Sequence, residues 1–146
     1  MKTRTLVMAG VVALAIMSST RVAQAQENMK VTIPFDFVAG NRSLPAGEYS
    51  VNVSGQTHML ILVDRKDGAP TILGAHDVVA REPQSQSKLI FNRYGDRYFL
   101  SQVWMQGNSR GRQLSKSARE KEIVQVAQVD TRNRVTLVAE LLRTTP

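Results

Sequence analysis

Apolar and polar residues alternate along much of the chain with the two-residue period of β-strands. From Lys30 to Val38 the apolar side chains share one face, and Glu48 to Val53 repeats the pattern. His58 to Val63 is apolar on both faces after its first residue, which is typical of a strand buried on both sides. Pro34 has no amide hydrogen to donate, so it predicts that the first strand lies at a sheet edge.

The strongest hairpin signal runs from Lys88 to Met105, with Gly95 and Asp96 at the turn. It follows a weaker strand over Thr71 to Ala80. Both faces of its second arm are apolar, so we expect this arm at the centre of the fold. Strict alternation places Phe99, Val103 and Met105 on one face and Tyr98, Leu100 and Trp104 on the other.

A glycine-containing loop is predicted from Gln106 to Gln113, followed by a helix. Ser117 and Glu120 have capping-box spacing, which satisfies two amide donors at a helix start. The alternative is a strand over Ile123 to Val129 that pairs with the closing strand, Arg134 to Leu142; the helix is favoured. The apolar stripe of such a helix would consist of Ala118, Ile123, Val126 and Ala127.

These elements predict a mainly β protein with about seven strands and one helix in the C-terminal half. Short strands separated by turn signals favour an antiparallel β-sandwich or a small barrel. We expect one domain over residues 26–146, because that length supports a single hydrophobic core.

Residues 1–25 have the features of a signal peptide. Lys2 and Arg4 precede an apolar run from Leu6 to Met17, and Ala23 and Ala25 form a small-x-small cleavage site. The run is too short to span a bilayer, which takes about 20 residues, so no transmembrane anchor is expected. The domain is therefore predicted to be exported, to the periplasm or the cell exterior.

Charge and cysteine content narrow the classes of partner. The signal peptide contributes Lys2, Arg4 and Arg21 and no acid, so its removal lowers the net charge from +7 to +4. A mildly basic domain does not favour nucleic acid as a partner. The chain has no cysteine, which excludes disulfides, thiol catalysis and a lipid-attachment cysteine.

No pattern of catalytic or metal-binding residues stands out. His76 and Asp77 have the types of a base and its orienting acid, but neighbours on a strand point to opposite faces. No zinc spacing, calcium loop or glycine-rich phosphate loop is present, so neither a metal nor a cofactor is expected. The sequence therefore assigns no catalytic residue.

The most distinctive local feature is a basic stretch that contains one acid, Glu120. One interpretation is a dock for an anionic surface, such as lipid headgroups or an acidic glycan. The other is a solvated loop followed by the exposed face of a helix. The candidate binding residues are Arg110, Arg112, Lys116, Arg119 and Lys121.

Two blocks resemble small exported bacterial proteins of uncharacterised function. The first reads IPFDFVAGNRSLPAGEYSV from Ile33, and the second reads NRYGDRYFLSQVWMQGNSRG over Asn92 to Gly111, followed by a Leu-Ser-Lys-Ser helix start. The resemblance implies an exported, compact β-rich domain and brings no known site residues. Ser115 stands where that group often has proline.

The leading hypothesis is a non-enzymatic binding or envelope-associated module whose partner is an anionic envelope component or a protein. One alternative is a small hydrolase with a site assembled from His76, Asp77 and a loop serine. Another is a small carrier of an apolar ligand. The carrier requires an enclosed cavity lined by residues such as Phe35, Leu60, Phe91 and Leu100.

Overall fold

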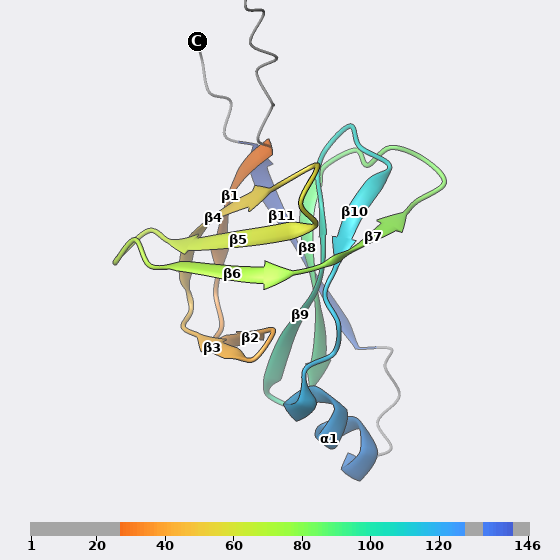
Figure 1. The fold of residues 1–146 in the computed structure, drawn as a ribbon. Helices are drawn as coiled ribbons and strands as arrows, with labels where there is room; N and C mark the ends of the chain where they lie inside the picture. The colour runs from red at the N-terminus through yellow and green to blue at the C-terminus, as the bar shows by residue number, and fades with distance from the viewer. Residues whose placement is uncertain (1–26, 128–132, 142–146) are drawn as a thin grey trace, which may run out of the picture.

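The computed structural model describes residues 27–127 and 133–141, and this part of the chain is mainly β with one helix, as predicted (Figure 1). The predicted signal peptide, residues 1–25, lies outside the described residues. The strands are more numerous and shorter than the seven expected. They are β1 (Glu27–Ile33), β2 (Phe37–Ala39), β3 (Arg42–Leu44), β4 (Gly47–Val53), β5 (Met59–Asp64), β6 (Pro70–Gly74), β7 (His76–Val79), β8 (Ser87–Tyr94), β9 (Arg97–Trp104), β10 (Arg110–Gln113) and β11 (Arg134–Leu141).

The strands form two sheets that share β11. Along the path β3-β2-β9-β8-β11-β1-β4-β5-β6 every neighbouring pair is antiparallel except β2 and β9. β11 pairs with β8 over most of its length and with β1 at its end, and β10 joins β9 to β7. In Figure 1, β5 and β6 run across the direction of β8 and β9. The result is the predicted sandwich-like arrangement.

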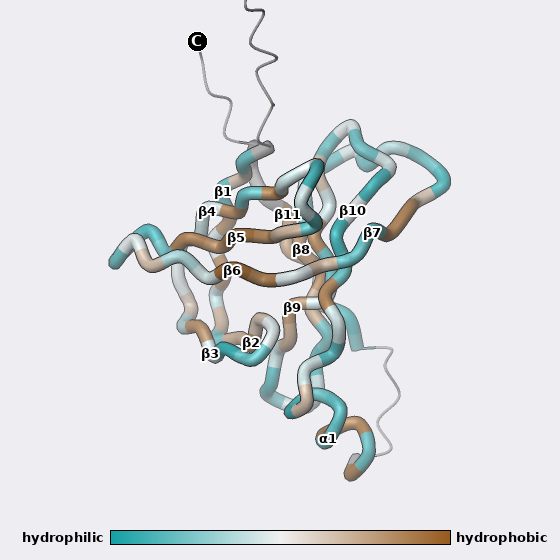
Figure 2. The backbone as a smooth tube through the Cα atoms, in the orientation of Figure 1, coloured by the Kyte–Doolittle hydropathy of each residue, from teal (hydrophilic) through white to brown (hydrophobic). Residues whose placement is uncertain are grey.

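The hydrophobic core lies between the two sheets. Figure 2 shows hydrophobic residues along β5 and β6 and hydrophilic residues in the turn that joins them. Three of the residues named for a carrier cavity, Leu60, Phe91 and Leu100, are core residues at most 3% exposed. The ring of Phe35 meets that of Phe91 edge-on, with centroids 5.2 Å apart. All four side chains therefore contribute to the core, Phe35 as a half-buried side chain packed against it.

A β-bulge changes which side chains of β9 face the core. Ile90 pairs with Gln102, but Phe91 pairs with Leu100, so Ser101 is the extra residue. Leu100, Val103 and Met105 consequently belong to one core cluster, whereas Phe99 packs against Tyr94 with centroids 5.8 Å apart. The predicted grouping of Phe99 with Val103 was wrong because strict alternation allows no bulge.

Three other predictions differ from the structure. β1 ends at Ile33 and pairs along both edges, with β11 and β4, so Pro34 follows an inner strand and does not mark an edge. The predicted strand over 71–80 is divided at Ala75 into β6 and β7. The predicted loop over 106–113 ends in a strand, because β10 finds partners in β7 and β9.

The helix α1 (Ala118–Ala127) confirms the favoured alternative over a strand for 123–127; positions 128–129 lie outside the described residues. Ser117 Oγ accepts the Glu120 amide at 3.1 Å, as expected of a cap. Two residues of the predicted apolar stripe are exposed, Ala118 and Val126, the latter 88% exposed, and Ile123 is half-buried. A different residue, Glu120, attaches the helix to the sheet.

Glu120 is 4% exposed, and its Oε1 accepts hydrogen bonds from Asn92 Nδ2 at 2.8 Å and Tyr94 Oη at 3.1 Å. Its carboxylate therefore bonds to β8 and does not complete a capping box. Both donors come from the end of the β8–β9 hairpin beside which α1 lies in Figure 1. This buried group fixes the start of α1 against the sheet.

Two buried tyrosines predict a loss of stability at alkaline pH. Burial, and then the Glu120 charge, raises the pKa of Tyr94 to about 12, and burial with nearby aspartates does the same for Tyr49. The unfolded chain ionises near pH 10 while the folded chain keeps its protons, so this stability is complete below pH 10 and lost towards pH 12. Urea unfolding at stepped pH should show the decline, with a shallower slope in Tyr94→Phe. An equal slope in the variant would contradict this assignment.

Candidate functional site

β7 divides His76 and Asp77 between two clusters. Asp77 lies opposite Arg112 in the β7–β10 register, and His76 lies opposite Gln113. Asp77 makes its contacts with Arg112 and His58, whereas His76 contacts Ser115. The expectation that neighbouring strand residues point apart is confirmed, and the two do not form a base with its orienting acid.

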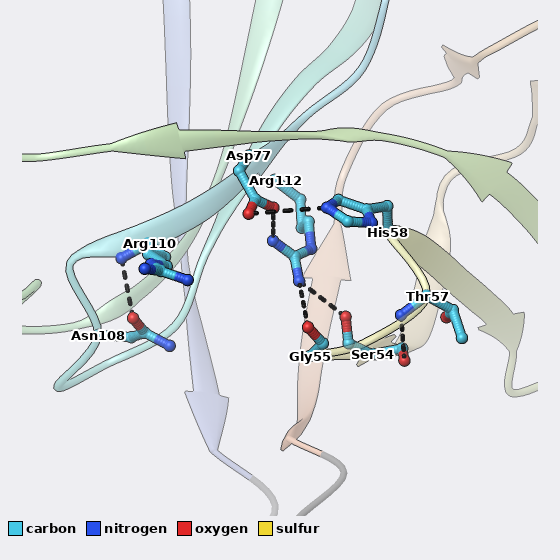
Figure 3. Close-up of polar contacts among 8 residues, drawn as sticks. All are labelled: Ser54, Gly55, Thr57, His58, Asp77, Asn108, Arg110 and Arg112. Atoms are coloured by element: carbon cyan, nitrogen blue, oxygen red, sulfur yellow. Dashed lines mark hydrogen bonds and ion pairs between the residues drawn. The ribbon is translucent and has the colours of Figure 1, made fainter.

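The Asp77 cluster joins the two sheets (Figure 3). Arg112 Nη1 donates to Asp77 Oδ1, and its Nη2 donates to the carbonyl oxygen of Ser54 at 2.8 Å. His58 Nε2 lies 3.8 Å from the other Asp77 oxygen. Ser54 belongs to the loop between β4 and β5, while Arg112 lies on β10. The guanidinium group therefore links the loop to the β7–β10 pair.

Arg112 is buried, with a side chain 7% exposed. Its Nε has no hydrogen-bond partner among the residues that the structure describes. It lines a cleft of about 250 Å³ together with Arg110 and Asn108. Because Asp77 and a backbone carbonyl already occupy its two terminal nitrogens, this arginine acts first as a structural clamp. Arg110 and Arg112 were both predicted to bind an anionic partner, and of these two residues Arg110 is exposed.

On the other side of β7, Ser115 Oγ and His76 Nε2 are 2.8 Å apart, and both side chains are exposed. They line a cleft of about 220 Å³ with Lys116, Arg134 and the buried Glu120. The hydrolase alternative required a concave site with a hydroxyl within reach of His76. The structure contains that arrangement, with Ser115 as the serine and without Asp77.

The remaining predicted cations are distributed over separate places. Arg119 lines a cleft of about 350 Å³ that also holds two acids, Asp36 and Asp96, and its Nη1 donates to Ser43 Oγ at 3.4 Å. Lys121 is exposed on α1. Lys116 lies just before α1, and in Figure 1 that end of the molecule is remote from the loop preceding β10. The basic stretch thus does not gather on one surface.

The largest of these clefts, about 480 Å³, lies between the β2–β3 turn and the start of α1. It brings Arg42 and Lys116 together and includes Ser115 and Ser117. No acidic side chain of the described chain lines it. We name it the Arg42–Lys116 cleft. Two cations without a counter-charge, inside a concavity, favour an anionic ligand.

Sequence reasoning missed Arg42 because nothing in the local pattern links a short turn to a helix start far along the chain. The close approach depends on Gly40, which has a φ of +60°. A Cβ atom at this position would lie 2.9 Å from Leu73 Cδ2. Glycine therefore permits both the turn and its packing against β6, which form one wall of the cleft.

The comparisons with known proteins add no relative: no family model matches the chain, and neither a curated protein nor a solved structure was found to be similar. Within residues 27–127 and 133–141, no helix has the length and apolar character needed to cross a membrane.

Proposed function

We propose that residues 26–146 form an exported binding module that holds an anionic component of the cell envelope in the Arg42–Lys116 cleft. The signal peptide features support export to the periplasm or the cell exterior. The observation that carries the proposal is the cleft itself, which joins two cations and no acid. Its volume of about 480 Å³ lies within the range of small-ligand sites.

The lining of the cleft narrows the ligand class to an amphiphile. Ile72, an exposed apolar residue on β6, is 58% exposed and belongs to the same cleft as Arg42 and Lys116. Leu73 and Leu114 add buried apolar surface beside it. Adjacent cationic and apolar surfaces suit a lipid whose phosphate contacts the cations while its glycerol and first methylenes contact the apolar side chains.

Charge reversal at Lys116 tests the proposal. A cation near an anionic membrane contributes on the order of 1 kcal/mol, so Lys116→Glu is expected to weaken binding to phosphatidylglycerol vesicles by about tenfold or more at low salt. Arg42→Glu should act in the same direction. Co-sedimentation, with bound protein measured against lipid concentration, gives the partition coefficients.

Lys121→Glu is the matched control, because it makes the same change of charge in the same basic stretch but outside the cleft. It should weaken binding less than Lys116→Glu, and phosphatidylcholine vesicles should bind neither protein. If the two variants lost vesicle binding equally, the loss would reflect the net charge of the protein. The assignment of binding to the Arg42–Lys116 cleft would then be wrong.

A further inference from the structure

We infer that Ser115 and His76 form a nucleophile–base pair through which the protein accepts an acyl group from a small ester. Ser115 Oγ and His76 Nε2 are 2.8 Å apart, the distance of a hydrogen bond through which a base removes the hydroxyl proton. For Nε2 to accept that bond, the imidazole carries its own proton on Nδ1. Both side chains are exposed, so an ester reaches them without a conformational change.

The pair is held by regular structure on both sides. His76 is the first residue of β7 and lies opposite Gln113 in the β10 register. The amide of Leu114, which precedes Ser115, donates to the Ser101 carbonyl at 2.8 Å. Ser117, two residues after Ser115, caps α1. The backbone is thereby fixed close to both residues, and the 2.8 Å contact joins their two side chains, as a nucleophile and its base require.

The chemical step is a transesterification to the serine. Ser115 Oγ forms a bond with the ester carbonyl carbon while its proton moves to His76 Nε2. The bond between that carbon and the leaving oxygen then breaks, and the leaving alkoxide takes the proton from His76. Water then attacks the acyl carbon while His76 removes its proton. The bond between that carbon and Ser115 Oγ breaks, Oγ takes the proton from His76, and a carboxylic acid is released.

The cleft around the pair indicates the substrate class. Its volume of about 220 Å³ accommodates a short acyl group. Lys116 and Arg134 line it, while the Glu120 carboxylate is already bonded to Asn92 and Tyr94. A short ester with a neighbouring phosphate or carboxylate fits this charge. The nucleophile–base pair is defined by the Ser115–His76 contact, although Ser115 and Lys116 also line the Arg42–Lys116 cleft.

The rate of turnover is expected to be low. Asp77, the acid next to His76 in sequence, bonds to Arg112 on the opposite face of β7. In the described part of the chain no carboxylate contacts His76. Disabling the orienting acid of a catalytic triad lowers kcat about 10⁴-fold. Because repeated turnover would be slow, the formation of the acyl-serine is the step to measure.

The test follows the first turnover of the purified protein with an excess of p-nitrophenyl acetate. We expect a burst of p-nitrophenol and one acetyl group on the peptide that contains Ser115, identified by mass spectrometry. Ser115→Ala should abolish this label, and His76→Asn should slow acetylation by about 10²-fold or more, since a general base contributes on that scale.

Ser85→Ala and His58→Asn are the controls, because each removes an exposed serine or histidine outside the cleft. Both should be acetylated like the unaltered protein. Acetylation of Ser115 that is unchanged in His76→Asn, or no acetylation of Ser115 at all, would overturn the inference. A protein that binds anionic vesicles but is not acetylated would contradict this inference alone, and one that is acetylated but does not bind vesicles would contradict only the proposed function.

Discussion

Arg112→Ala is expected to lower the free energy of unfolding by about 2–3 kcal/mol, less than the cost of breaking a fully buried ion pair, because the Asp77 side chain is 37% exposed. The Arg112 side chain is 7% exposed and bonds to Asp77 and to the Ser54 carbonyl, so its loss leaves both acceptors without their donor. It also disconnects the β4–β5 loop from β10. Urea unfolding followed by the fluorescence of Trp104, the single tryptophan of the chain, measures the change.

Arg110→Ala is the control for this prediction. Arg110 lies two residues away on the same strand and is exposed, and its replacement removes the same charge, so it should change stability by less than about 0.5 kcal/mol. Similar midpoints for the two variants would show that Arg112 is not a clamp. In that case its place among the candidate binding residues would have to be reconsidered.

Glu120→Ala is expected to cost about 3 kcal/mol. The substitution removes two hydrogen bonds to a charged acceptor and leaves Asn92 Nδ2 and Tyr94 Oη without it in a buried environment. Because Glu120 attaches α1 to β8, the segment that carries Ser115 and Lys116 should also lose its fixed position. Amide hydrogen exchange at the start of α1 should therefore accelerate.

Glu122→Ala provides the comparison on the same helix, since Glu122 is exposed and should be nearly neutral. Glu120→Gln keeps an acceptor oxygen and should recover part of the lost stability. If Glu120→Ala unfolded at the same urea concentration as Glu122→Ala, the carboxylate would not be the anchor of the helix.

Local pattern was sufficient for the class of fold. The Gly95–Asp96 turn lies between β8 and β9, Ser117 caps α1, and β4 covers the residues expected of it. These elements depend on side-chain periodicity and turn chemistry within a few residues, and both are visible in the sequence.

Features that depend on distant partners could not be predicted in this way. β10 forms a strand because it pairs with β7 on one side and β9 on the other, although its residues are polar apart from one glycine. The extra residue Ser101 moves Val103 to the face of Leu100, and no local signal announces the bulge. Pairing across the sheet therefore overrides the period of the sequence.

The candidate site was only partly visible for the same reason. Lys116 was included through its neighbours in sequence, whereas its partner Arg42 enters through the packing of the β2–β3 turn. The sequence grouped Arg112 with exposed cations, but in the structure its side chain is buried and paired with Asp77. Composition showed the charge, and tertiary contacts determined which charges can meet a ligand.

The most direct test of the proposed site is NMR mapping of an anionic headgroup. We expect that titration of ¹⁵N-labelled protein with short-chain phosphatidylglycerol, below its micelle concentration, shifts the amide signals of 40–42 and 115–118. These signals should move at lower lipid concentrations than any others, and their shifts should reach a plateau when the site is full. Signals near Lys121 and around the Arg112 clamp should move little. Shifts centred on Arg110 or on the cleft at Arg119, or no shifts in the Arg42–Lys116 cleft, would contradict the account.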